Sequence, residues 1–180
     1  FLFGGKGERA DWHWDLSTTY GRNNIHHSSD FNINPSLGTA TPTKFDNLAT
    51  FRFEQWVNNF DLTRRYDSLF GLTSPVQVSA GLEHRWERFS TFAGDPEAYI
   101  TGNSPAASGA QAAVTLRPED EVSLIRNNYA AYLDLGFDLT ERWFLDLAGR
   151  VEHYDDDSGN TFGLKLNSRY ELTDQVAVRG

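Results

Sequence analysis

Residues 129–139, with the sequence YAAYLDLGFDL, alternate apolar and polar side chains one by one. One parity carries Tyr129, Ala131, Leu133, Leu135, Phe137 and Leu139, and the other carries Ala130, Tyr132, Asp134, Gly136 and Asp138. Successive side chains of a β-strand point to opposite faces, so this stretch predicts a strand with one face suited to lipid and one suited to water.

The same alternation recurs along the chain and predicts an all-β fold. We expect an antiparallel up-and-down meander of about seven strands, the last cut short, with no domain boundary in residues 1–180. The expected strands lie near residues 10–22, 48–65, 76–87, 129–139, 143–152, 162–170 and 175–180. Strands of about 9–11 residues are long enough to cross a bilayer, so the meander is predicted to be part of a transmembrane β-barrel.

The connections assign a side of the membrane to each strand end. Longer polar connections are expected at 23–47, 91–125 and 155–160, and shorter ones at 66–74, 140–142 and 173–174. Bacterial membrane barrels have short periplasmic turns and longer outer loops, so the first set is predicted to face outside. Aromatic residues then mark two membrane interfaces. Those near the periplasm are Trp12, Trp14, Trp143 and Tyr170, and those near the outside are Tyr20, Trp86 and Tyr129.

Composition excludes several classes of protein. A formal net charge of -9 opposes binding to nucleic acid, which needs clustered Lys and Arg. The chain has no run of about 18 apolar residues, so it is not a helical membrane protein. It contains neither Cys nor Met and begins at Phe1, so we treat it as a piece of a longer protein. A soluble β-sandwich alternates in the same way. The alternation of long and short connections, and the aromatic residues at the ends of the expected strands, favour a membrane barrel over a soluble sandwich.

Three segments carry a resemblance to a known family. NNYAAYLDLGFDLTERWFLDLAGRVEHYDD (127–156) and NTFGLKLNSRYELTDQVAVRG (160–180) resemble the middle of the barrel of TonB-dependent outer-membrane receptors. NPSLGTATPTKFDNL (34–48) resembles a loop of the same family. The resemblance covers most of the chain and is strongest over its last third.

The resemblance implies a barrel of about 22 strands in the bacterial outer membrane, of which about a third is present here. The N-terminal plug domain and the closing C-terminal strands are expected outside residues 1–180. Membership implies import of a scarce solute, with energy passed through TonB to the plug, and no enzymatic step. We expect an iron–siderophore complex as the solute, although carbohydrate and cobalamin importers share the architecture. The expected partners are the plug, TonB, lipid and the solute, with no cofactor, no resident metal and no nucleic acid.

Charged residues on the water-facing parity are candidates for contact with the plug or with a passing solute. They are Glu83, Arg85, Asp134, Asp146, Arg150, Glu152, Lys165 and Arg169. If the strands near 143–152 and 162–170 pair so that partner numbers sum to 317, Glu152 faces Lys165. The alternative is that these charges are solvated or paired across strands, with little net energy.

Residues of the expected outer loops are candidates for ligand binding. They are His26, His27, Asp30, Phe31, Phe92 and Tyr99. Imidazole and carboxylate groups can bind a metal complex, although adjacent loop histidines are usually only exposed. Packing within the loops explains the aromatic residues equally well. The Asp-rich segment 155–160 lacks the spacing of a calcium loop, so a polar hairpin turn is favoured there.

Two other classes of function remain open. A passive porin-type channel would use the same barrel without a plug. A soluble carbohydrate-binding β-sandwich would bury the apolar parity inside a protein core.

Overall fold

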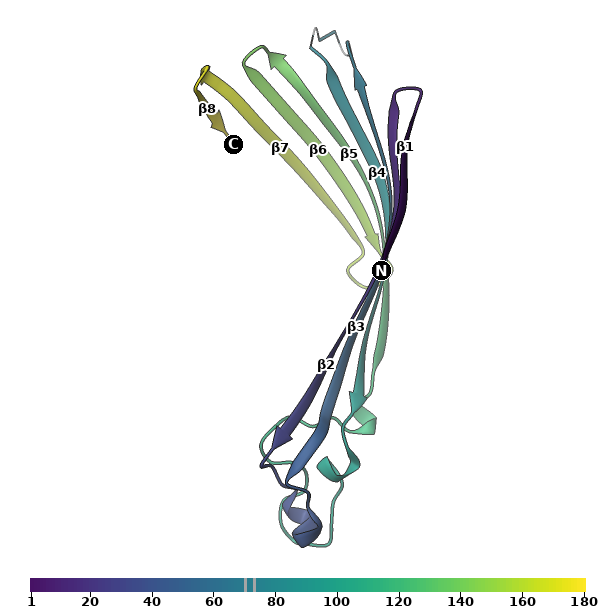
Figure 1. The fold of residues 1–180 in the computed structure, drawn as a ribbon, viewed down its shortest axis with the longest axis vertical. Coiled ribbons are helices and arrows are strands. Elements are labelled where there is room, and N and C mark those ends of the chain that lie inside the picture. Colours follow the sequence, from purple (N-terminus) through teal and green to yellow (C-terminus); the bar gives the residue numbers. More distant parts are fainter. Residues whose placement is uncertain (70, 73) are drawn as a thin grey trace. The chain divides into compact units, whose positions relative to one another are not determined.

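The computed structural model describes residues 1–69, 71–72 and 74–180. Eight strands form one antiparallel sheet in which spatial order follows chain order (Figure 1). The strands are β1 (Leu2–Arg9), β2 (Trp12–Asp30), β3 (Lys44–Tyr66), β4 (Val76–Ala93), β5 (Ser123–Thr140), β6 (Trp143–Tyr154), β7 (Asn160–Thr173) and β8 (Val176–Arg179). Three short 3-10 helices lie in the long connections: η1 (Pro35–Ala40), η2 (Pro96–Ala98) and η3 (Pro118–Asp120).

The predicted meander is confirmed, with one strand more than expected. β1 precedes the first expected strand and pairs with β2 from Leu2 opposite Thr19 to Arg9 opposite Trp12. The alternation pattern missed β1 because three of its eight residues are glycines, which have no side chain to alternate. The described strands form a single sheet, so the soluble sandwich, which needs two sheets packed face to face, is wrong.

Strands β2 to β5 are longer than the sequence pattern indicated. They contain 19, 23, 18 and 18 residues, whereas about 9–11 residues suffice to cross a bilayer. The connections shrink accordingly, from the expected 23–47 to 31–43 and from the expected 91–125 to 94–122. The polar composition of residues 23–30 favoured a loop, but the ladder hydrogen bonds of a strand come from its backbone, so polar side chains do not prevent pairing.

The chain divides into two compact units. The first, here called the barrel unit, comprises 1–20, 56–86 and 126–180, and the second, the loop unit, comprises 21–55 and 87–125. In the described part of the chain, no helix has the length and apolar character required to cross a membrane.

The barrel unit has an apolar face that no described residue of the chain covers. Leu82, Leu133 and Leu147 are 60%, 49% and 40% exposed, and Leu164 is 77% exposed. Their strand neighbours on the other parity are polar or small, as the alternation predicts. These leucines are therefore not part of a globular core, and this is the arrangement expected of a surface that meets acyl chains.

The register of β6 and β7 corrects the expected pairing. Ala148 faces Lys165 and Glu152 faces Thr161, so partner numbers sum to 313 rather than 317. The five-residue turn between the strands sets this register. Its last residue, Gly159, has a φ of 64° and its N–H donates to the carbonyl of Asp156 (3.2 Å), which closes the turn two residues earlier than expected. An even shift leaves every side chain on its predicted face.

The loop unit has its own small core. Phe45, Leu48 and Ala98 are buried together, with Ala110 packed against them. Phe45 is the largest side chain of this core and is only 1% exposed. Apolar contact is limited, so polar interactions carry much of the organisation.

Two buried asparagines join the connections 31–43 and 94–122. Asn34 is fully buried, and its side-chain N–H groups donate to the carbonyls of Glu97 (2.9 Å) and Ile100 (2.8 Å). Its carbonyl accepts from the Ser36 hydroxyl (2.8 Å) and the Gly109 N–H (2.9 Å). Asn32 likewise accepts from the backbone N–H groups of Gln111 and Ala112. The two connections are therefore one preformed structure.

Replacing Asn34 by Ala should open the loop unit locally. The change leaves the half-buried Gly109 N–H and two carbonyls without their partner, and each such group costs up to about 1–3 kcal/mol where it is shielded from water. We expect faster amide exchange at Gly109 and faster proteolysis between residues 98 and 116 in the full-length protein. Asn103→Ala, an exposed change in the same connection, is the matched control. Equal exchange in the two variants would contradict the role of Asn34.

The turn between β6 and β7 should weaken in acid. The pKa of Asp155 lies below its ordinary value because its carboxylate accepts from the Asn127 side chain (2.8 Å) and the Asn127 N–H (2.7 Å). A depressed pKa contributes stability above the unfolded-state pKa of about 3.9, and this stability is lost as pH falls through the folded-state pKa.

We therefore expect the exchange protection of the Asn127 amide to fall between about pH 5 and about pH 2. Asp155→Asn should show weaker protection throughout this range and no such transition, whereas Asp157→Asn, an exposed change in the same turn, should behave as the parent. A transition that persists in Asp155→Asn would assign it to another group.

Candidate functional site

A cluster of four charged side chains lies on the polar face of the barrel unit. Glu83 accepts from Arg85 (Nη2 to Oε1, 2.6 Å) and from Arg150 (Nη2 to Oε1, 3.2 Å). Arg150 also contacts Glu152 (Nη2 to Oε1, 2.8 Å), whose second oxygen accepts from the Thr161 hydroxyl (3.0 Å). The sequence placed all four charges on one face, and the structure brings them together from β4 and β6. Two acidic and two basic groups make the cluster electrically balanced.

A second group forms around Asp146. Its Oδ2 accepts from Asn167 (2.7 Å) and from Lys165 (3.4 Å) on the neighbouring strand β7. Its other oxygen, Oδ1, is buried and has no hydrogen-bond partner among the described residues. Asp134 lies against the same carboxyl group. Lys165 thus pairs with Asp146 and not with Glu152, as the shorter turn requires.

Arg169 stands apart from both groups. Its guanidinium pairs with Glu171 (Nη2 to Oε1, 3.3 Å) and lies 5.7 Å from the centre of the Phe144 ring. Both charged side chains of this pair are more than two-fifths exposed, so the pair contributes little to stability. The structure therefore joins seven of the eight predicted water-facing charges into two groups and leaves Arg169 outside them.

An unpredicted contact crosses three strands on the same face. The Tyr132 hydroxyl on β5 donates to Asp61 Oδ1 on β3 (2.5 Å), and the Tyr132 ring passes directly over Gly81 on β4. A Cβ at position 81 would overlap the ring. An aromatic residue on the polar parity, two strands away from an aspartate and separated by a glycine, is the sequence signal that could have revealed it.

The adjacent histidines do not form a joint site. His26 and His27 lie on β2 and not in a loop, so their side chains point to opposite faces of the sheet. His26 Nδ1 lies 2.9 Å from the Thr50 hydroxyl, and the His27 ring packs edge-on against Phe51 at 5.4 Å. Across the described residues, no group of three or more His, Asp or Glu side chains is placed to hold a metal ion.

Asp30 ends β2 and takes part in a charged contact with β3. Lys44 Nζ lies 3.2 Å from Asp46 and 3.9 Å from Asp30. The pKa of Lys44 is raised, first by the hydrogen bond to Asp46 and then by the two carboxylates. The carboxylate of Asp30 therefore faces a cation of the chain itself.

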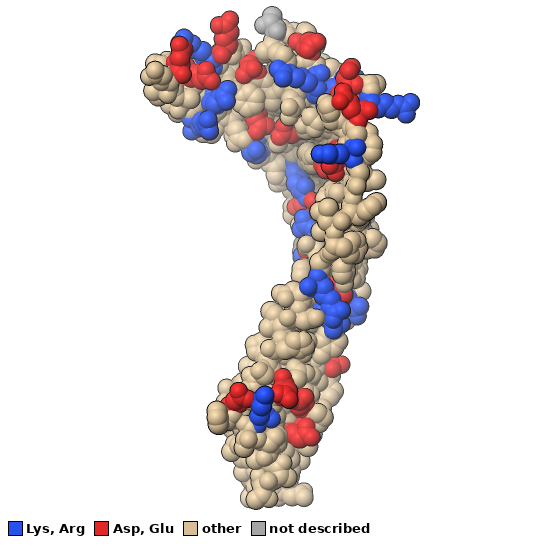
Figure 2. All heavy atoms as spheres, viewed as in Figure 1, with Lys and Arg blue, Asp and Glu red and all other residues tan. Residues whose placement is uncertain are grey.

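The three predicted loop aromatics differ in exposure. Phe92 is half-buried on β4 under the guanidinium of Arg52, 4.6 Å from its ring centre, and Tyr99 is half-buried after η2. Phe31 is 97% exposed and follows β2 directly. The end of the loop unit, at the bottom of Figure 2, carries neither acidic nor basic side chains on the face shown.

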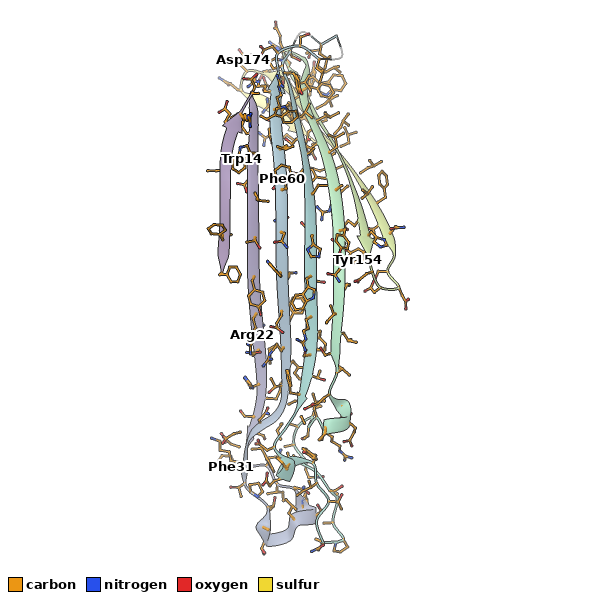
Figure 3. All side chains as sticks on the ribbon, turned by 90° about the vertical axis from the view of Figure 1, so that its right-hand side faces the viewer. Trp14, Arg22, Phe31, Phe60, Tyr154 and Asp174 are labelled. Carbon is orange, nitrogen blue, oxygen red and sulfur yellow. The ribbon has the colours of Figure 1, made fainter. Side chains whose placement is uncertain are left out.

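The predicted interface aromatics of the barrel unit form two sets, one beside the short turns and the other within the longer strands β2, β4 and β5, which continue past Tyr20, Trp86 and Tyr129. Trp12 meets Tyr66 edge-on (6.4 Å) near the short turns, and Trp143 meets Tyr170 in the same way (6.3 Å). Toward the longer connections, Tyr129 stacks on His84 (4.9 Å), Tyr20 stacks on Phe1 (5.7 Å), and Trp86 is half-buried. In Figure 3, Trp14 lies near the β1–β2 turn and Tyr154 at the β6–β7 turn. Tyr66, which sequence reasoning missed, belongs to the first set.

Residues 155–159 form a polar turn, as favoured from the sequence, and Asn160 begins β7. The Asp155 carboxylate accepts a hydrogen bond from the Asn127 side chain. The Asp156 carboxylate accepts from the Ser158 N–H (2.9 Å) and lies 3.7 Å from the Arg126 guanidinium. The carboxylates serve separate partners instead of converging. The charged groups around Glu83 and Asp146 can hold or guide another molecule through hydrogen bonds and charge. Their arrangement among the described residues offers no group placed for a chemical step.

Comparison with known proteins agrees with this geometry. The family model described as "TonB dependent receptor-like, beta-barrel" matches residues 2–180. No curated protein matches the chain. The eight-stranded meander, its uncovered apolar face and its polar opposite face are those of a section of such a barrel. The chain belongs to the TonB-dependent receptor β-barrel family, whose members are transporters, not enzymes, of the bacterial outer membrane and work with a plug domain and TonB.

Proposed function

We propose that this chain is part of a receptor that captures an iron–siderophore complex and imports it with energy delivered through TonB. The observation that carries the proposal is the preformed loop unit, in which Asn32 and Asn34 fix two long connections before any ligand arrives. Preorganisation reduces the entropy lost on binding and so favours tight capture of a scarce solute.

Tight capture makes energy coupling necessary. Affinity differences among related complexes lie mostly in dissociation rates, so a tightly held solute leaves its site slowly. A passive porin-type channel needs weak binding to conduct, whereas a receptor that captures tightly needs an input of energy for release. This contrast favours the energised importer over the porin alternative.

We further propose that the eight strands close with others into a barrel of about 22 strands around a plug. β1 and β8 each have one neighbour in the sheet, and an open sheet edge is not tolerated within a bilayer. The predicted interface aromatics would contact lipid headgroups at both ends of the apolar band. The water-facing charges of the Glu83–Arg150 and Asp146 groups would contact the plug.

Uptake of radioactive iron bound to a siderophore tests the importer. Cells that carry the full-length receptor should accumulate the complex, and accumulation should stop when TonB is deleted. Synthesis of the receptor should rise under iron limitation. Uptake that continues without TonB would support the passive channel, and synthesis indifferent to iron would remove iron from the proposal.

Arg150→Ala tests contact between the charge cluster and the plug. The change leaves Glu83 and Glu152 without their shared partner, and hydrogen bonds to a charged group contribute about 1.5–3 kcal/mol. We expect looser plug retention and therefore greater sensitivity of cells to a large antibiotic such as vancomycin.

The matched control is Arg169→Ala, which removes an arginine that pairs outside the cluster. The amount of folded receptor in each strain, measured by its heat-dependent mobility on gels, must be equal. Sensitivity that is the same in the two variants would place the cluster away from the plug.

A further inference from the structure

Phe31 combines two features that do not stabilise the loop unit. Its φ is 56°, in the left-handed region where a bulky side chain is rare, and its side chain is 97% exposed. Figure 3 labels it where β2 ends and the connection to β3 begins. Such strained residues persist only where the surrounding structure holds them in place. They cluster at active sites and ligand-binding sites, where the strain is part of the function.

The backbone conformation at this position has a structural reason. Asn32, the next residue, is 2% exposed, and its N–H donates to the Thr43 carbonyl (3.2 Å). Its side-chain oxygen accepts from the N–H groups of Ile33 (2.9 Å), Gln111 (3.0 Å) and Ala112 (3.1 Å). The left-handed residue at position 31 lets the chain turn so that Asn32 enters this buried position.

The turn at position 31 explains the backbone conformation but not the phenylalanine side chain. Glycine adopts a positive φ without strain and is the residue expected where only the turn matters. Ala10 and Asp11, the other described non-glycine residues with positive φ, form the two-residue β1–β2 turn, whose geometry calls for that conformation. An exposed aromatic ring kept in a strained position indicates a role outside folding.

The surroundings of Phe31 in the sequence are free of charge. Residues 31–43 and 98–116, which meet through Asn32 and Asn34, contain no Asp, Glu, Lys, Arg or His. The loop unit as a whole has nine acidic and five basic residues, so its net charge is negative. A polyanionic solute would find no cation within residues 31–43 or 98–116 and would be repelled by the net negative charge of the loop unit.

We infer that Phe31 is a ligand-contact residue and that the solute offers it an electrically neutral, partly apolar face. The inference rests on the proposed import of an iron chelate and narrows it to uncharged chelates, such as the hydroxamate type, against polyanionic chelates of the catecholate type. The ring stacks on the solute, and the uncharged segments 31–43 and 98–116 disfavour charged competitors because they offer no compensating charge.

Binding of two ferric complexes to the purified full-length receptor tests the inference. The probes are a neutral ferric trihydroxamate and a polyanionic ferric tricatecholate, each followed by quenching of tryptophan fluorescence. We expect the neutral complex to bind at least about tenfold more tightly, and its affinity to change little with salt.

Three substitutions separate the ring from the strain. Phe31→Ala removes the ring and keeps the strained backbone, whereas Phe31→Gly removes both. Both should weaken binding of the neutral complex by about tenfold, as expected for a ring that becomes partly buried on the ligand. Phe31→Gly alone should also raise the midpoint of thermal unfolding, because strain is relieved. Phe31→Tyr retains the ring and should retain binding.

Ala10→Gly is the matched control, since it relieves a positive φ of 52° in the short β1–β2 turn and should leave binding unchanged. Equal or tighter binding of the tricatecholate would overturn the inferred ligand class while import of iron stands. Unchanged affinity in Phe31→Ala and Phe31→Gly would overturn the role of Phe31. If neither complex binds, both this inference and the proposed iron–siderophore ligand are overturned. TonB-dependent transport is tested separately, by the uptake experiment.

Discussion

The structure depends on the backbone hydrogen bonds between neighbouring antiparallel strands. In a bilayer each backbone N–H and C=O must find its partner within the protein, and a ladder between strands provides it. Once the ladder exists, the period of two assigns each side chain to one face. The barrel unit follows this constraint closely, with Leu133 and Leu147 on one face and Asp134 and Arg150 on the other. The separation of the apolar and polar faces is therefore a consequence of the hydrogen-bond ladder between the strands.

The alternation predicted faces well and lengths poorly. Leu133, Asp134 and Glu152 lie on the faces that periodicity assigned, because parity survives any even error in register. The β6–β7 register differed by four in its partner sum because Gly159 closes the turn early, which depends on one backbone dihedral angle. β1 was missed because Gly4, Gly5 and Gly7 carry no hydrophobic signal, although they pair as well as other residues.

The site was predicted in part for the same reason. Placement of Glu83, Arg85, Arg150 and Glu152 on one face follows from parity, but their mutual contacts depend on the register across strands. His26 and His27 were assigned to a loop on composition, and composition does not report backbone pairing. The buried roles of Asn32 and Asn34 join residues more than 60 positions apart, which no local pattern reveals.

The small apolar core of the loop unit has a thermal consequence. Phe45, Leu48, Ala49 and Ala98 are its fully buried apolar residues, while Asn34 and Asn32 supply much of the cohesion. Unfolding heat capacity rises with apolar exposure and falls with polar exposure, so local opening of this unit changes heat capacity little. The free energy of opening this unit then varies almost linearly with temperature. It does not fall on cooling, as the stability of a predominantly apolar core does. The connections 31–43 and 94–122 would therefore stay closed in cold water.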